Sequence, residues 1–106
     1  MITMLLDQKT AIVTGGAGGI GQATAKAMAA EGARVAVVDL DLAAAQAVVD
    51  EIVATGGDAL AIAADVSDVE SVARAVRAVH DAFGRIDILF NNADIIRRTT
   101  VLETSP

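Results

Sequence analysis

Residues 10–21 read TAIVTGGAGGIG, in which five apolar or β-branched residues precede five glycines within seven positions. The run 10–14 predicts a strand, and the Ala-rich segment that begins at Ile20 predicts a helix. The glycines therefore fill the turn between a strand and a helix. Because glycine has no Cβ atom, such a turn adopts positive φ readily and brings backbone N–H groups close to a bound molecule.

The same alternation of strand and helix continues beyond this stretch. Strands are predicted at 10–14, 34–40, 59–66 and 86–91, and helices at 20–31, 42–55 and 68–83. The strand segments are too apolar to face water on one side, so we expect each to be buried on both faces. The pattern predicts an α/β fold with a doubly wound parallel sheet (Rossmann), truncated to four strands in order 3-2-1-4 with three helices. Right-handed crossovers then place the first two helices on one face and the third on the other.

Polar residues and glycines mark the ends of the predicted helices. Ser67 and Glu70 fit the Ser-x-x-Glu pattern, which predicts a capping box at the start of the third helix, and Asp41 is the expected N-cap of the second. Each helix is followed by a glycine at the position where a left-handed residue commonly ends one, namely Gly32, Gly56 and Gly84.

Composition narrows the class of protein. The 106 residues carry a formal net charge of −6, which argues against nucleic acid and anionic membrane as partners. The absence of Cys excludes disulfides, thiolate metal sites and cysteine catalysis. No apolar window reaches the roughly 18 residues of a membrane span, and residues 1–7 lack the pattern of a signal peptide. We therefore expect a cytoplasmic protein without a metal site.

The glycine turn is a candidate phosphate site. In a doubly wound fold, the pyrophosphate of a dinucleotide sits at the turn after the first strand, against the N–H groups at the N-terminus of the following helix. Two spacings fit the residues: GxGxxG at 16, 18 and 21, and GxxxGxG at 15, 19 and 21. A flexible loop is the alternative, which the flanking strand and helix disfavour. The expected contacts to the cofactor are Gly15, Gly18, Gly19, Ile20 and Gly21.

Asp39 points to the identity of the cofactor. It ends the second predicted strand, 18 residues beyond Gly21, where a carboxylate accepts both ribose hydroxyls of the adenosine half. The same carboxylate would repel a 2′-phosphate, and no Arg or Lys stands at positions 16, 17 or 40–42 to compensate. The sequence therefore predicts NAD rather than NADP. The alternative role, capping the second helix, suits Asp41 better.

Four segments in this order resemble the N-terminal half of a short-chain dehydrogenase/reductase: TGGAGGIG at 14–21, Asp39, DV at 65–66 and NNA at 91–93. The resemblance covers nearly the whole chain and favours the GxxxGxG spacing. It implies that Asp65 and the backbone of Val66 read the adenine edge. It also implies that Asn92 lies along the cofactor ribose, while Asn91 braces neighbouring strands.

Two departures from the family pattern concern chemistry. Asp94 stands where the family's Asn-Asn-Ala-Gly motif has Gly, which adds a negative charge near an anionic cofactor. The family transfers hydride with a Ser, a Tyr-x-x-x-Lys pair and an Asn that come later in its sequence, whereas this chain has no Tyr, and neither Lys9 nor Lys26 matches the motif. The resemblance thus implies residues 1–106 to be the dinucleotide-binding half-Rossmann domain, incomplete at the C-terminus, of an NAD-dependent oxidoreductase acting on an alcohol or carbonyl. The chain alone is predicted to be inactive.

Other readings of the sequence remain. His80 suits a helix surface better than catalysis. Residues 95–98, IIRR, are similar to members of the family that act on sugar acids, with a solvated loop as the alternative. A self-associating module without turnover and a methyltransferase using S-adenosylmethionine are the competing functions, the latter disfavoured by NNA after the fourth strand. Because the fourth strand is an apolar edge and the third helix is rich in Val, we also expect a homo-oligomer.

Overall fold

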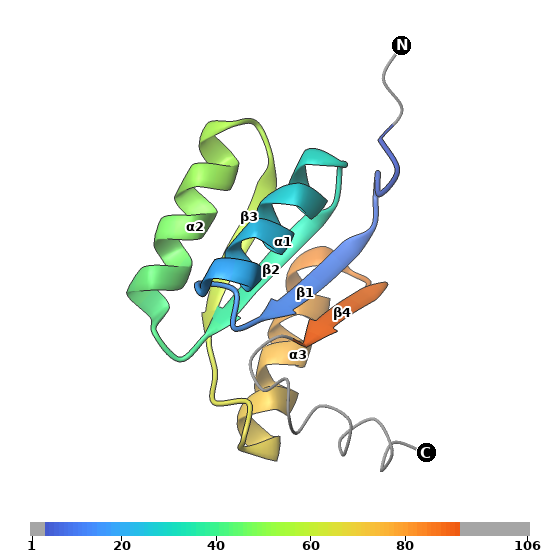
Figure 1. Cartoon of the computed structure of the whole chain (residues 1–106). Coiled ribbons are helices and arrows are strands. Elements are labelled where there is room, and N and C mark those ends of the chain that lie inside the picture. The colour runs from blue at the N-terminus through green and yellow to red at the C-terminus, as the bar shows by residue number, and fades with distance from the viewer. Residues whose placement is uncertain (1–3, 92–106) are drawn as a thin grey trace.

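The computed structural model describes residues 4–91 and shows a parallel sheet with helices on both faces (Figure 1). Its four strands run in the order β3-β2-β1-β4. The elements along the chain are β1 (Thr10–Thr14), α1 (Gly19–Ala30), β2 (Arg34–Asp39), α2 (Leu42–Ala54), β3 (Asp58–Ala63), α3 (Val69–Phe83) and β4 (Ile88–Asn91). The predicted fold class, strand order and number of helices are confirmed.

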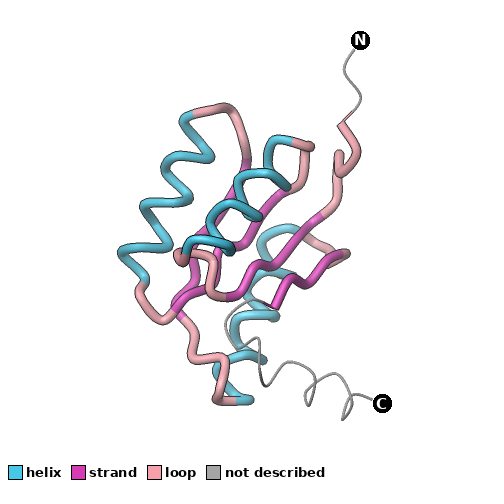
Figure 2. Tube along the Cα trace, viewed as in Figure 1, coloured by secondary structure: helices cyan, strands magenta, loops and turns pink. Residues whose placement is uncertain are grey.

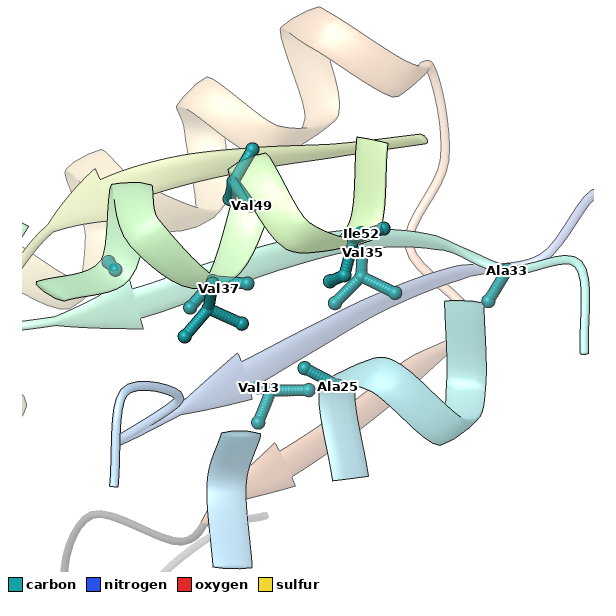
Figure 3. Packing of buried hydrophobic residues seen from close by; sticks show 9 residues of the cluster. Val13, Ala25, Ala33, Val35, Val37, Val49 and Ile52 are labelled. Carbon is teal, nitrogen blue, oxygen red and sulfur yellow. The ribbon is translucent and has the colours of Figure 1, made fainter. Parts of the chain in front are cut away.

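The helices cover the two faces of the sheet unequally. Helices α1 and α2 lie together on one face and α3 lies on the other, as the two views show (Figures 1 and 2). On the first face, Val13 and Val37 of the central strands pack against Ala25 of α1 and against Val49 and Ile52 of α2 (Figure 3). On the other face, Ile12, Ala36 and Val38 pack against Ala75 and Val79 of α3. The placement predicted from right-handed crossovers is confirmed.

Burial distinguishes the central strands from the outer ones. All five residues of β1 and four of the six in β2 are buried, whereas β3 and β4 have only partly buried or exposed residues. Leu89 pairs with Ile12 in register, so it points to the α3 face, yet its exposed fraction is 63% because α3 lies over β1 and β2. The expectation that all four strands are buried on both faces is therefore wrong for the outer two.

The caps and stop residues predicted for the helices are observed, except at the start of α3. Asp41 caps α2 by accepting a hydrogen bond from the Ala44 N–H at 3.1 Å. The three stop glycines have positive φ, namely +97° at Gly32, +91° at Gly56 and +82° at Gly84. The predicted capping box is wrong, because the N-cap of α3 is Asp68, whose carboxylate accepts the Glu70 N–H at 3.0 Å.

At the edge of the sheet where the strands begin, the Asp87 carboxylate connects two segments of the chain. Asp87 Oδ2 accepts the Thr10 N–H at 2.9 Å, and the Asp87 N–H donates to the Thr10 carbonyl, also at 2.9 Å. Arg85 forms an ion pair with the same carboxylate at 2.7 Å. The Arg85 side chain, followed by the Thr10 N–H, lowers the pKa of Asp87 below its ordinary value. These contacts join the segment before β4 to the start of β1.

Candidate cofactor-binding site

The carboxyl ends of β1, β2 and β3 meet at one edge of the sheet, where the predicted site residues gather. A pocket of about 230 Å³ opens there, lined by Gly15, Asp39, Leu40, Ala64 and Val66. These residues come from three separate strand ends, because parallel strands bring their carboxyl ends to the same edge. The site therefore forms only when the first three strands pair.

The glycine turn leads directly into α1. Gly15 has φ +64°, and its carbonyl accepts the Gly18 N–H at 3.1 Å, which closes the turn. The Gly16 N–H donates to the Val38 carbonyl at 3.2 Å and so ties the turn to β2. Gly18 is the N-cap of α1, and no side chain within residues 4–91 caps this helix. Its first N–H groups are therefore suited to an anion, which the helix dipole also favours.

The glycines of this turn differ in what a Cβ atom would meet. A Cβ at Gly21 would lie 2.2 Å from the Gly15 carbonyl oxygen, and one at Gly16 would lie 2.7 Å from Cγ1 of Val37. At Gly19 a Cβ would meet no atom within 4 Å. The packing of the chain thus explains Gly16 and Gly21 but leaves the space beside Gly19 empty. Open space at the N-terminus of α1 leaves room for an anion beside its first N–H groups.

Asp39 ends β2 with both carboxylate oxygens bonded to backbone. Oδ2 accepts the Ala17 N–H at 3.1 Å, and Oδ1 accepts the Asp41 N–H at 3.0 Å. The cap of α2 is Asp41, so Asp39 is not the helix cap. The contact with Ala17 could not be found in the sequence, because it uses a backbone N–H that every residue except proline carries.

Asp65 lies in the loop after β3 rather than in the strand. The predicted strand 59–66 ends at Ala63. Oδ1 of Asp65 accepts the Ser67 O–H at 2.6 Å and the Ser67 N–H at 2.9 Å, and these bonds lower the pKa of the Asp65 carboxyl. The Asp65 N–H donates to Oγ of Ser71 at 2.9 Å, a contact that no motif in the sequence signals. These bonds favour the ionised Asp65, which lies in the chain between two residues that line the pocket, Ala64 and Val66.

The ends of β1 and β4 are joined by side chains. The Thr14 hydroxyl donates to Oδ1 of Asn91 at 2.8 Å. This contact agrees with the bracing role expected of Asn91. The remaining predicted positions, Asn92 together with Asp94, Arg97 and Arg98, lie outside the described residues.

Other features of residues 4–91 lie away from this edge. His80 is exposed on α3. A hollow of about 490 Å³ lies between α1 and α2, beside the Lys26–Glu51 ion pair of 3.1 Å, and it includes none of the predicted site residues. No helix in this part of the chain has the length and apolar character needed to cross a membrane. The described residues also hold no group of three or more acidic or His side chains placed to bind a metal ion.

Comparisons with known proteins agree with the geometry. The profile of the family described as short chain dehydrogenase matches residues 9–106. A sorbitol dehydrogenase of Cereibacter sphaeroides is 49% identical over 100 residues, which are 94% of this chain and 38% of that protein. A crystal structure of a dehydrogenase/reductase from Sinorhizobium meliloti 1021 has TM-score 0.83 and 50% identity, covering 88% of this chain and 37% of that one. A metagenomic short-chain oxidoreductase in complex with NADP has TM-score 0.80 and 41% identity, covering 85% of this chain and 41% of that one.

The chain therefore spans well under half the length of these relatives. The family match disfavours both competing functions, the assembly module and the methyltransferase. It also confirms the resemblance carried by the glycine turn, Asp39, and the segments at 65–66 and 91–93. By its sequence and its fold, the chain belongs to the short-chain dehydrogenase family.

Proposed function

We propose that this chain is the NAD-binding part of an oxidoreductase and that it holds the adenosine and pyrophosphate of the cofactor at the carboxyl edge of the sheet. The observation that carries the proposal is the empty space beside Gly19, at the N-terminus of α1, next to a turn that Gly15 and Gly21 pack tightly. The family binds nicotinamide cofactors, which supply a hydride acceptor or donor when bound.

Different residues contact different parts of the cofactor. Gly15 and Gly18 form the turn against the pyrophosphate, and the N–H groups of Gly19, Ile20 and Gly21 at the start of α1 donate to it. Asp39 accepts the adenosine ribose hydroxyls, and Asp65 with the Val66 backbone meets the adenine. The pocket lined by Gly15, Asp39 and Val66 supports this arrangement, because it lies between the turn and the loop after β3. Asn92 is assigned to the cofactor ribose by the resemblance alone.

The preference for NAD rests on Asp39. One relative was solved with NADP, so family membership alone does not decide between the two cofactors. A 2′-phosphate beside Asp39 would place two negative charges together, with no Arg or Lys at positions 16, 17 or 40–42. Like charges in contact cost several kcal/mol, so we expect NAD to bind about tenfold or more tightly than NADP.

The reaction of the whole protein is the interconversion of an alcohol and a carbonyl by hydride transfer. The relative named sorbitol dehydrogenase and the solved dehydrogenases support this class. The family's Tyr-x-x-x-Lys pair has no counterpart among these 106 residues. We therefore expect this chain to bind cofactor without turning over an alcohol.

Calorimetry of the full chain with NAD and NADP tests the proposal. We expect heat of binding with NAD, and none with Gly19→Val, because the side chain fills the space kept for the pyrophosphate. Ala27→Val is the matched control, since it places the same side chain at an exposed position of the same helix, away from the turn. Full binding by a folded Gly19→Val chain would place the phosphate site elsewhere.

A further inference from the structure

Two backbone N–H groups hold the carboxylate of Asp39, one on each oxygen. Oδ2 accepts the Ala17 N–H and Oδ1 accepts the Asp41 N–H, at 3.1 and 3.0 Å. Hydrogen bonds to a charged acceptor are stronger than those between neutral groups. Each oxygen also keeps further lone-pair capacity, because a carboxylate offers about four acceptor sites. The side chain can therefore hold both backbone N–H groups and still accept ribose hydroxyls.

Ala17 is the middle residue of the glycine turn. Two further hydrogen bonds shape this turn, and both join backbone to backbone, from Gly16 to Val38 and from Gly18 to Gly15. The bond from Ala17 to Asp39 joins the turn to the end of β2 through a side chain, across 22 residues. Glycines on both sides of Ala17 leave the turn with large backbone freedom, so a fixed point at its centre limits the conformations it adopts.

We propose that Asp39 is a positioning residue for the pyrophosphate-binding turn as well as a contact to ribose. The inference rests on the proposed cofactor site and adds a second role to one of its residues. Through this carboxylate, the choice of cofactor and the shape of the turn depend on the same side chain.

With and without the positioning role, Asp39→Ala should change the affinity for an anion without ribose hydroxyls in opposite directions. If Asp39 only adds negative charge near the site, then Asp39→Ala strengthens the binding of an anion that has no ribose hydroxyl. If Asp39 also holds the turn, then Asp39→Ala weakens the binding of that same anion. Dideoxy-ADP (2′,3′-dideoxyadenosine diphosphate) is such a ligand, because it keeps the pyrophosphate and the adenine but has neither hydroxyl.

Calorimetry with ADP and dideoxy-ADP, on the full chain and two variants, separates these roles. We expect Asp39→Ala to bind dideoxy-ADP about tenfold more weakly than the parent chain, the usual scale for losing a hydrogen bond to a charged group. Asp41→Ala is the control, because it removes a negative charge only two residues away. The Asp41 carboxylate accepts the Ala44 N–H of α2 rather than an N–H of the turn. Asp41→Ala should bind dideoxy-ADP at least as tightly as the parent. Unchanged or tighter binding by Asp39→Ala overturns the positioning role.

Hydrogen exchange of the Ala17 amide is a second test, and it needs no ligand. We expect the Ala17 N–H to exchange slowly in the parent chain and in Asp41→Ala, and rapidly in Asp39→Ala. Fast exchange in the parent overturns the inference. If no nucleotide binds the parent chain, the proposed function fails, and slow exchange at Ala17 still decides the positioning role. Asp39→Asn, which keeps one acceptor oxygen, serves where Asp39→Ala does not fold.

Discussion

The glycine turn contains two kinds of glycine that a sequence motif cannot tell apart. Gly16 and Gly21 are required by the packing of the chain, since a Cβ at either would lie within 3 Å of another atom. Gly19 has open space around the same position, and a Cβ at Gly18 would meet only an ordinary contact of 3.5 Å. The first pair is therefore required by the fold, whereas the second pair is assigned to the ligand by the proposed cofactor site. Substitutions in the two pairs should separate stability from binding.

The largest effect is expected at Gly21. Gly21→Ala places a Cβ 2.2 Å from the Gly15 carbonyl oxygen, where the clash is with backbone that cannot turn aside. We expect the free energy of unfolding to fall by about 3 kcal/mol or more, the upper range for overpacking. Gly19→Ala is the matched control and should gain about 0.5 kcal/mol, since alanine favours a helix over glycine. Thermal unfolding followed by circular dichroism measures both, and equal stability of the two variants would remove the distinction.

A smaller loss is expected at Gly16. Its Cβ would lie 2.7 Å from Cγ1 of Val37 and 3.0 Å from the Val13 carbonyl oxygen, so a side chain and a backbone must each shift. We expect Gly16→Ala to lower the free energy of unfolding by about 1–2 kcal/mol. The folded variant should still bind NAD, because the substitution faces the sheet rather than the ligand. Urea unfolding and calorimetry on one preparation test the two halves of this prediction, and loss of binding in a folded variant would assign Gly16 to the ligand.

Unfolding measured as a function of acid pH tests the contribution of Asp87 to stability, at a position outside the proposed cofactor site. Arg85 and the Thr10 N–H lower the pKa of Asp87 from 3.8, so folding favours the ionised carboxyl. Its contribution to stability is complete above pH 3.8 and is lost as the pH falls through the lowered pKa of the folded chain. Asp87→Asn should reduce the loss of stability in this range without changing NAD binding at neutral pH. Hydrogen bonds from Ser67 lower the pKa of Asp65 as well, so Asp65→Asn is the parallel variant.

The smallest effect on stability and binding is expected at Leu89, which neither the core nor the proposed site uses. Its side chain is 63% exposed on β4, an outer strand of the sheet. We expect the chain to self-associate through this strand and α3, and Leu89→Lys to weaken that association by placing a charge on an exposed edge. Sedimentation in dilute buffer measures the change, while NAD binding serves as the control. A monomeric parent chain would contradict this prediction.

The sequence was most informative where one local pattern decides the structure. The sequence predicts the strand 10–14 with the bounds observed. It also places Asp41 and the three stop glycines correctly, because caps and left-handed turns depend on neighbouring residues alone. The predicted third strand, 59–66, runs beyond the observed end at Ala63, because the apolar character of Ala64 and Val66 indicates burial rather than strand pairing. Two acceptors one residue apart, Ser67 and Asp68, could each cap α3, and the pattern selected the wrong one. No sequence pattern predicts the contact between Asp39 and Ala17, because its donor is a backbone N–H.

The pairing of β4 with β1 bears on the order in which the sheet forms. Residues paired between β1 and β2, and between β2 and β3, lie 24 positions apart in sequence, whereas those paired between β1 and β4 lie 77 apart. Closing the longer loop costs about 1 kcal/mol more in chain entropy. The hydrogen bonds of Thr10 with Asp87 and of Thr14 with Asn91, at the two ends of this pairing, offset part of that cost only after β4 has arrived. The first three strands, which already contain the glycine turn, Asp39 and the loop to Asp65, therefore have the shorter route to assembly, and β4 is the strand expected to join last.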